Sequence, residues 1–187
     1  MKFSTSTSLK ICIFAANFAM DSVTASAAAP QNASPFGLEI GVATCDAARA
    51  ILGKVSESKL DNNDVLLEAA NPSALYEGAT KLIVRCSEKR VFAVQFEASK
   101  GGMGNEASRD VYAGLARKYK RVEGGPMPSL GNGYARFVSG NSVVEQSAPH
   151  LSFEFTVTYY EKGLYDSIVA SNKANAKKSR DSKQSSL

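Results

Sequence analysis

The sequence has one histidine among 187 residues, and this scarcity excludes several kinds of site. A single histidine cannot build a histidine-rich metal centre, and no carboxylate cluster has the spacing of metal ligands. A Ser-His-Asp triad would have to use His150, but the sequence contains no G-x-S-x-G nucleophile motif. We expect His150, which follows Pro149, to be an exposed loop residue. No metal, cofactor or catalytic residue is predicted.

Other enzyme signatures are incomplete. The stretch Ser56-Glu57-Ser58-Lys59 matches S-x-x-K, but the companion S-D-N and K-T-G signatures of penicillin-recognising enzymes are missing. The glycine run at 101–104 lacks the Lys-Ser/Thr ending of a phosphate-binding loop, so it is predicted to be a flexible connector. Scattered carboxylates or serines leave a hydrolase with an unrecognised site as an alternative to a non-catalytic protein.

The body of the chain lacks net positive charge, which is confined to the two ends. The net charge is +4, but the first 27 residues carry +1 and residues 172–187 carry +4, which leaves −1 for the body. A body of this charge gives no reason to expect nucleic-acid binding.

No segment is long and apolar enough to cross a bilayer, which takes about 20 residues. At the N-terminus, Lys2 and Lys10 precede the apolar run 11–16, and small residues lead up to Ala27. This order predicts a secretory signal peptide over 1–27, with Ala29 as a second candidate for the cleavage position. A disordered Ala/Ser-rich extension is the alternative. We expect a periplasmic or secreted protein.

Cysteine is scarce too, with three in the chain, and Cys12 would be removed with the signal peptide. Two cysteines of an exported protein usually pair, which predicts a Cys45–Cys86 disulfide. The bridge would enclose about 40 residues and stabilise the fold by roughly 4 kcal/mol. A redox or nucleophilic role for Cys45 at a helix N-terminus is the rival interpretation, although no C-x-x-C is present. Two unpaired thiols are the third interpretation.

The rest of the chain divides into a linker at 28–35, a folded body at 36–171 and a disordered basic tail at 172–187. The body is predicted to be one α+β domain, or two fused halves at about 36–100 and 101–171. In the first half, Thr44 can cap a helix that ends before Gly53. A strand over 65–69 and a hairpin of strands follow, with Leu82, Val84 and Cys86 on one face of its first strand and Phe92, Val94 and Phe96 on one face of its second.

The second half repeats this rhythm. Asn105 can cap a second helix, which is expected to stop at the Gly124-Gly125-Pro126 stretch. Strands are predicted over 133–138, 142–147 and 151–160, and Leu164 begins a possible C-terminal helix. The order is helix, three strands, helix, three strands. This pattern predicts an antiparallel sheet with helices on one face.

The last predicted strand has the clearest two-sided pattern. Its apolar side is Leu151, Phe153, Phe155, Val157 and Tyr159, and one face should be buried while the other is solvated. Tyr160 on the outward face, and Tyr165 beyond it, are candidate protein-binding residues. Covering by a helix would explain these two tyrosines equally well.

The basic tail offers a different kind of contact. Each lysine or arginine near an anionic surface contributes about 1 kcal/mol of binding energy, and salt weakens it. The tail could therefore touch anionic lipid or polysaccharide, or it could simply solubilise the protein. Its candidate residues are Lys173, Lys177, Lys178, Arg180 and Lys183.

The stretch Phe36-Gly37-Leu38-Glu39-Ile40-Gly41-Val42-Ala43-Thr44, with Leu52-Gly53 closing the helix, resembles an opening found in small exported bacterial proteins. It is similar to the outer-membrane assembly lipoproteins of SmpA/OmlA type and to the halves of β-lactamase-inhibitor proteins. The lipid-bearing cysteine is missing, and Gly53 is not followed by proline. The resemblance implies a non-enzymatic protein that binds another protein across its sheet, with no functional residue carried over.

These observations favour a non-catalytic exported envelope protein whose sheet face binds another envelope or secreted protein. A periplasmic or secreted hydrolase, and a surface binder acting through the basic tail, are the alternatives.

Overall fold

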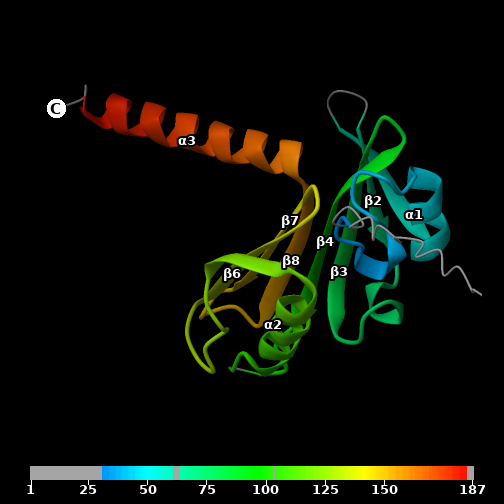
Figure 1. Ribbon diagram of the computed structural model, residues 1–187, viewed down its shortest axis with the longest axis horizontal. Coiled ribbons are helices and arrows are strands. Elements are labelled where there is room, and N and C mark those ends of the chain that lie inside the picture. The colour runs from blue at the N-terminus through cyan, green and yellow to red at the C-terminus, as the bar shows by residue number, and fades with distance from the viewer. Residues whose placement is uncertain (1–30, 61–63, 103, 185–187) are drawn as a thin grey trace, which may run out of the picture.

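All eight strands form one antiparallel sheet, in the order β1-β2-β3-β4-β8-β7-β6-β5 (Figure 1). The computed structural model describes residues 31–60, 64–102 and 104–184, so the predicted signal peptide and Cys12 lie outside the described residues. The α+β class and the antiparallel sheet are confirmed. The elements are α1 (Cys45–Leu52), β1 (Val55–Lys59), β2 (Val65–Ala69), β3 (Ala79–Ser87), β4 (Arg90–Ser99), α2 (Glu106–Lys118), β5 (Lys120–Gly124), β6 (Gly133–Ser139), β7 (Ser142–Ala148), β8 (Glu154–Glu161) and α3 (Lys162–Gln184).

Each half contains four strands rather than the predicted three. The two strands that the sequence pattern missed, β1 and β5, lie at the two edges of the sheet. Their sequences, VSESK and KRVEG, are short, polar and largely exposed. Edge strands of this composition bury no apolar face, so they lack the period-two signal. The segment before Gly124 is therefore a strand, and α2 ends earlier, at Lys118.

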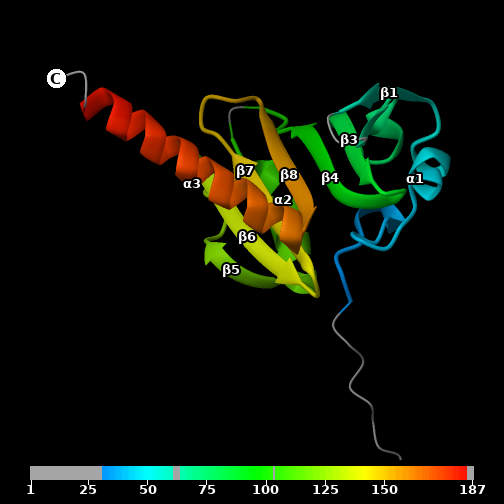
Figure 2. The same cartoon turned by 90° about the horizontal axis from the view of Figure 1, so that it is seen from above.

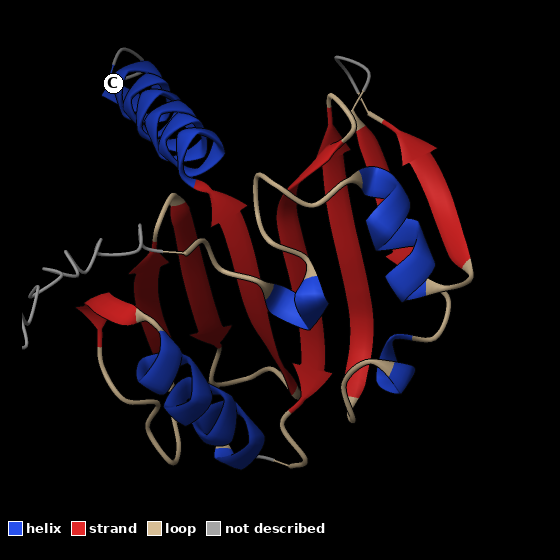
Figure 3. Cartoon of the chain, turned by 45° about the vertical axis from the view of Figure 1, so that its right-hand side comes forward, coloured by secondary structure: helices blue, strands red, loops and turns tan. Residues whose placement is uncertain are grey.

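The two halves are related by an approximate two-fold axis perpendicular to the sheet. Each half is a helix followed by four strands. In each half the first strand lies at an edge of the sheet and the fourth lies at its centre, so β1 to β4 correspond to β5 to β8. The central strands β4 and β8 pair antiparallel, with Phe96 opposite Val157. This relation places α1 and α2 on the same face of the sheet, as Figure 3 shows. We call this the covered face.

The covered face carries the hydrophobic core. One row of paired residues crosses six strands and is apolar throughout. Ala48 and Leu52 of α1 and Leu115 of α2 pack onto this core. Full burial of a large apolar side chain contributes about 1.5–3 kcal/mol, so the core fixes which face each strand presents. The row is Leu67, Val84, Val94, Tyr159, Val144 and Phe137.

The two predicted helix caps differ. Thr44 Oγ1 accepts a hydrogen bond from Ala47 N at 3.1 Å, and Gly53 ends α1 with φ 70°, so both predictions for this helix are confirmed. Asn105 does not cap α2 through its side chain. Instead, its buried Nδ2 donates to the carbonyl oxygens of Pro128 and Gly131, both at 3.0 Å, and ties the start of α2 to the β5–β6 loop.

Two aromatic residues leave the pattern predicted for them. The predicted strand from 151 begins only at Glu154, because Ser152 N donates to Pro149 O in a turn. Phe153 is therefore 67% exposed in the β7–β8 loop, whereas Phe155 is fully buried. Phe92 leaves the face of Val94 and Phe96 because the pairing of β3 with β4 shifts register at this point.

The end of the predicted linker packs against the domain. Ala33 is fully buried, and its N–H donates to Ser142 Oγ at 3.1 Å. Asn32 Oδ1 accepts from Asn141 N at 2.7 Å, and Ser139 Oγ donates to Gln31 O at 2.8 Å. Residues 31–35 therefore belong to the folded body, which begins earlier than the predicted residue 36.

The predicted C-terminal helix is present as α3, and it continues through most of the segment predicted to be disordered. It runs to Gln184 and projects away from the sheet (Figures 1 and 2). The residues from Val169 to Arg180 are all exposed, so only its first turns contact β7 and β8. Tyr165 in its first turn bonds to Arg136 and Glu145 on the face opposite α1 and α2, so the helices do not all contact one face. Among the described helices, none combines the length and the apolar character that a membrane crossing requires.

Candidate functional site

The face opposite α1 and α2, which we call the open face, is polar and continuous across all eight strands. Among the described helices, α1 and α2 lie on the other face, and the start of α3 contacts this one through Tyr165. Its central row faces away from the core at every position. That row, read from one edge to the other, is Ser56, Glu68, Ile83, Gln95, Thr158, Glu145, Arg136 and Glu123.

A connected group of aromatic and charged side chains occupies the β6–β7–β8 end of the open face. Arg136 Nη1 donates to the Tyr165 hydroxyl at 2.5 Å, and this hydroxyl donates to Glu145 Oε1 at 3.0 Å. The Tyr134 hydroxyl donates to the same carboxylate oxygen at 2.6 Å. The Tyr160 ring lies 5.7 Å from that of Tyr165, centroid to centroid. We call these five residues the tyrosine–arginine cluster.

The electrostatics of the cluster keep its phenols neutral. Burial and the Glu145 carboxylate both raise the pKa of Tyr134. Burial raises the pKa of Tyr165 as well, and the hydrogen bond from Arg136 opposes that rise. The bond to Tyr165 raises the pKa of Arg136, whose guanidinium also pairs with Glu123. At neutral pH both phenols therefore remain hydrogen-bond donors to one carboxylate.

The structure brings together the two tyrosines singled out in the sequence. Tyr160 lies on the open face, and Tyr165 lies on the first turn of α3. The start of α3 therefore partly covers Tyr160, which faces away from the core. Sequence reasoning missed the other three members. Tyr134 and Arg136 do alternate with buried residues in β6, which marks them as outward-facing. Their meeting with Glu145 depends on the register of β6 with β7.

A second aromatic–arginine pair lies nearer the centre of the sheet. The Arg85 guanidinium stacks over the Phe92 ring at 5.5 Å. Among the described residues, Arg85 Nε is one of two buried side-chain polar atoms without a hydrogen-bond partner. The stacking leaves this Nε enclosed, so the contact of the guanidinium with the ring holds Arg85 in place on the sheet.

The two cysteines predicted to pair are neighbours. Cys45 is the first residue of α1 and Cys86 lies in β3, and both are buried free thiols. They line one open hollow of about 830 Å³ together with Arg49 and Glu88. Burial, assisted by the adjacent Cys45 thiol, raises the pKa of Cys86.

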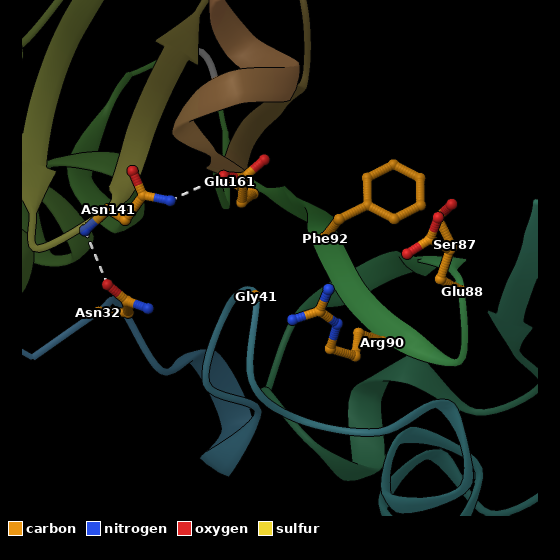
Figure 4. A pocket seen from close by; sticks show the side chains of 8 residues that line it. All are labelled: Asn32, Gly41, Ser87, Glu88, Arg90, Phe92, Asn141 and Glu161. Atoms are coloured by element: carbon orange, nitrogen blue, oxygen red, sulfur yellow. Dashed lines mark hydrogen bonds between the residues drawn. The ribbon is translucent and has the colours of Figure 1, made fainter.

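A smaller hollow of about 320 Å³ lies where the N-terminal segment meets the β3–β4 and β6–β7 turns (Figure 4). Three of the polar residues that line it, Asn32, Asn141 and Glu161, are bonded to one another. Asn141 Nδ2 donates to Glu161 Oε1 at 2.7 Å, and Leu164 N donates to the other Glu161 oxygen. Asn141 N donates to Asn32 Oδ1. These bonds make the hollow a structural junction that holds the start of α3.

The remaining candidates are dispersed. The side chains of Lys173, Lys177, Lys178 and Arg180 are exposed along α3, and the side chain of Lys183 lies outside the described residues. His150 lies in the exposed β7–β8 loop, where its backbone N–H donates to Asn132 Oδ1. Within the described ranges, no three His, Cys, Asp or Glu side chains gather as a metal site would require.

Comparison of this chain with protein-family models, curated proteins and solved structures finds no match.

Proposed function

We propose that this chain is a non-catalytic exported protein of the bacterial envelope, and that its open face binds another protein. The observation that carries the proposal is the tyrosine–arginine cluster, whose side chains are fixed by hydrogen bonds. Among the described helices, only the start of α3 contacts the face on which the cluster lies.

The open face is large enough for a specific protein interface. Eight strands at about 4.8 Å spacing make the sheet about 34 Å wide, and strands of five to ten residues are about 17–34 Å long. The resulting area is on the order of 600–1,000 Å². A standard interface buries about 800 Å² on each partner.

The composition of the cluster also favours protein binding. Tyrosine and arginine are enriched among the residues that dominate binding energy at interfaces. Here Tyr134, Tyr165 and Arg136 are fixed by shared bonds to Glu145 and by pairing with Glu123, so little side-chain freedom is left to lose on binding. Arg85, whose guanidinium lies over the Phe92 ring, adds a second aromatic–arginine pair to the sheet.

Export is supported by the signal-like order of the first 27 residues, in which positive, apolar and small residues follow one another. Pulse labelling with N-terminal sequencing of the mature chain tests this part separately. A new terminus near residue 28 in the periplasmic or culture fraction is expected. An intact precursor in the cytosol would contradict it.

Site-directed photo-crosslinking in intact cells tests the interface. A photoreactive residue replaces Thr156 or Glu97, which lie opposite one another on the open face. The matched control replaces Arg117, an exposed residue of α2 on the other side of the sheet. We expect one discrete heterologous adduct from each open-face position and none from the control.

The crosslinks also distinguish the alternatives. An adduct of twice the chain mass would identify a second copy as the occupant, and would overturn a separate partner protein. Equal adducts from the control and from the open face, or none from any position, would overturn the proposed interface.

A second candidate function rests on α3. The helix projects from the domain with exposed Lys173, Lys177 and Arg180 at spacings of four and three residues, which puts them on one side. We propose anionic-surface contact as its function. Deleting 172–187 should abolish sedimentation with phosphatidylglycerol vesicles at low salt while neutral vesicles bind neither form. Unchanged sedimentation would remove this candidate.

A further inference from the structure

We propose that Cys45 and Cys86 form a disulfide in the exported protein, and that this bond joins the start of α1 to the β3–β4 hairpin. The proposal rests on the exported location in the proposed function, but not on partner binding.

The backbone already holds both cysteines against the same hairpin. Cys45 N donates to Lys89 O at 2.9 Å, and Val91 N donates to Ala43 O at 2.8 Å. Within the hairpin, Cys86 pairs directly with Val91. The segment that carries Cys45 therefore lies along the turn that carries Cys86, with main-chain bonds on both sides of it.

The side chains are equally well placed. Both thiols line one hollow on the covered side, and they are close enough for the Cys45 thiol to act on the titration of Cys86. Cys45 is 7% exposed and Cys86 is 2% exposed. Because Cys45 is the more exposed of the two, an oxidant can reach this thiol first while Cys86 resolves the intermediate.

The chemistry is thiol–disulfide exchange with a dithiol-oxidising partner or a small disulfide such as oxidised glutathione. The Cys45 thiolate attacks the donor disulfide, which forms a mixed disulfide and releases one donor thiol. The Cys86 thiolate then attacks the Cys45 sulfur and expels the second donor thiol. The two protein thiols are oxidised by two electrons, the donor is reduced to two thiols, and the two protein protons end on them.

Peptide mapping of the purified full chain tests the bond. The chain is incubated with oxidised glutathione, denatured without reductant and alkylated with a maleimide. We expect one linked peptide that contains Cys45 and Cys86 and is 2 Da lighter than the sum of its reduced parts. The same chain, reduced before denaturation and alkylation, serves as the control and should carry maleimide on both cysteines. Full alkylation of Cys45 and Cys86 would overturn the proposal.

A comparison of the oxidised and reduced wild-type chains tests whether the bond stabilises the fold, with two cysteine variants as controls. A bond that encloses about 40 residues should raise the Tm of the oxidised protein by about 10 °C over the reduced protein. The Cys45→Ser and Cys86→Ser chains should each lose the dependence of Tm on reductant. Equal Tm values for oxidised and reduced wild-type chains would contradict a stabilising bridge. If the photo-crosslinks described above fail, the linked peptide and the Tm difference are unaffected. The open-face interface and the disulfide can therefore be overturned independently.

Discussion

Arg136 Nη1 donates to the hydroxyl of Tyr165 at 2.5 Å, and the Arg136 guanidinium also stacks over the Tyr165 ring at 5.5 Å. This pair connects β6 to the first turn of α3 across the open face. It ties the root of the projecting helix to the tyrosine–arginine cluster. Any partner that binds the cluster therefore also contacts the base of α3.

Phe153 and Phe155 provide a matched test of the fold, because an alternating strand would have buried both. Phe155→Ala removes a fully buried ring and should lower the free energy of unfolding by about 3–5 kcal/mol. Phe153→Ala removes an exposed ring and should change it by less than about 0.5 kcal/mol. Urea denaturation measures both. Equal losses would show that the strand extends back to residue 151.

The two helix starts should respond differently to alanine. Thr44→Ala removes one exposed capping bond and should lower the free energy of unfolding by about 1 kcal/mol. Asn105→Ala leaves the carbonyls of Pro128 and Gly131 without their donor and should lower it by about 2–3 kcal/mol. Chemical denaturation of the two variants gives the ranking. A larger loss for the Thr44 variant would contradict the loop-tying role of Asn105.

Stability should fall at alkaline pH. In six of the seven tyrosines burial raises the pKa above the ordinary value of 10, so the folded chain keeps phenol protons that the unfolded chain releases. This contribution is fully present below about pH 10 and is lost as pH rises toward the raised folded values. Lys100, whose pKa burial lowers, acts in the opposite direction as a single group. Burial also raises the pKa of the Cys86 thiol, which acts in the same direction as the tyrosines, so the oxidised chain, in which this thiol does not titrate, is the one measured. The six are Tyr76, Tyr119, Tyr134, Tyr159, Tyr160 and Tyr165.

Urea midpoints at pH 8, 9.5 and 11 measure this dependence, with the phenolate absorbance followed in parallel. We expect little change between the first two and a clear fall at the third. A midpoint that stays constant to pH 11 would mean that the phenols ionise as readily in the folded chain as in the unfolded chain.

The sequence predicted the elements whose own residues carry a strong local signal. The cap at Thr44, the stop at Gly53 and the alternation of Leu82, Val84 and Cys86 are all local features, and the structure confirms them. The edge strands β1 and β5 carry no such signal. They are strands because a neighbour offers hydrogen bonds, which depends on tertiary pairing rather than on their own apolar pattern.

The site was predictable only in part for the same reason. Tyr160 and Tyr165 could be recognised from the sequence because they lie close together in the chain and outside the apolar alternation of the last strand. Glu145, which accepts bonds from Tyr134 and Tyr165, lies on another strand, and only the β6–β7–β8 register brings the three together. The turn at Pro149 likewise overrides an otherwise regular apolar alternation.

Binding of a protein to the open face should depend on Arg136, so the decisive measurement is the affinity of the Arg136→Ala chain for the crosslinked partner. Isothermal titration of the purified pair, with Arg109→Ala on the exposed side of α2 as the matched control, gives both values. Loss of a hot-spot residue costs about 2 kcal/mol, so we expect Arg136→Ala to raise Kd about 30-fold. The Kd of the Arg109→Ala control should stay within about two-fold of the wild-type Kd, a change in binding free energy below roughly 0.4 kcal/mol. Wild-type affinity in a folded Arg136→Ala chain would mean that the partner does not bind at the tyrosine–arginine cluster.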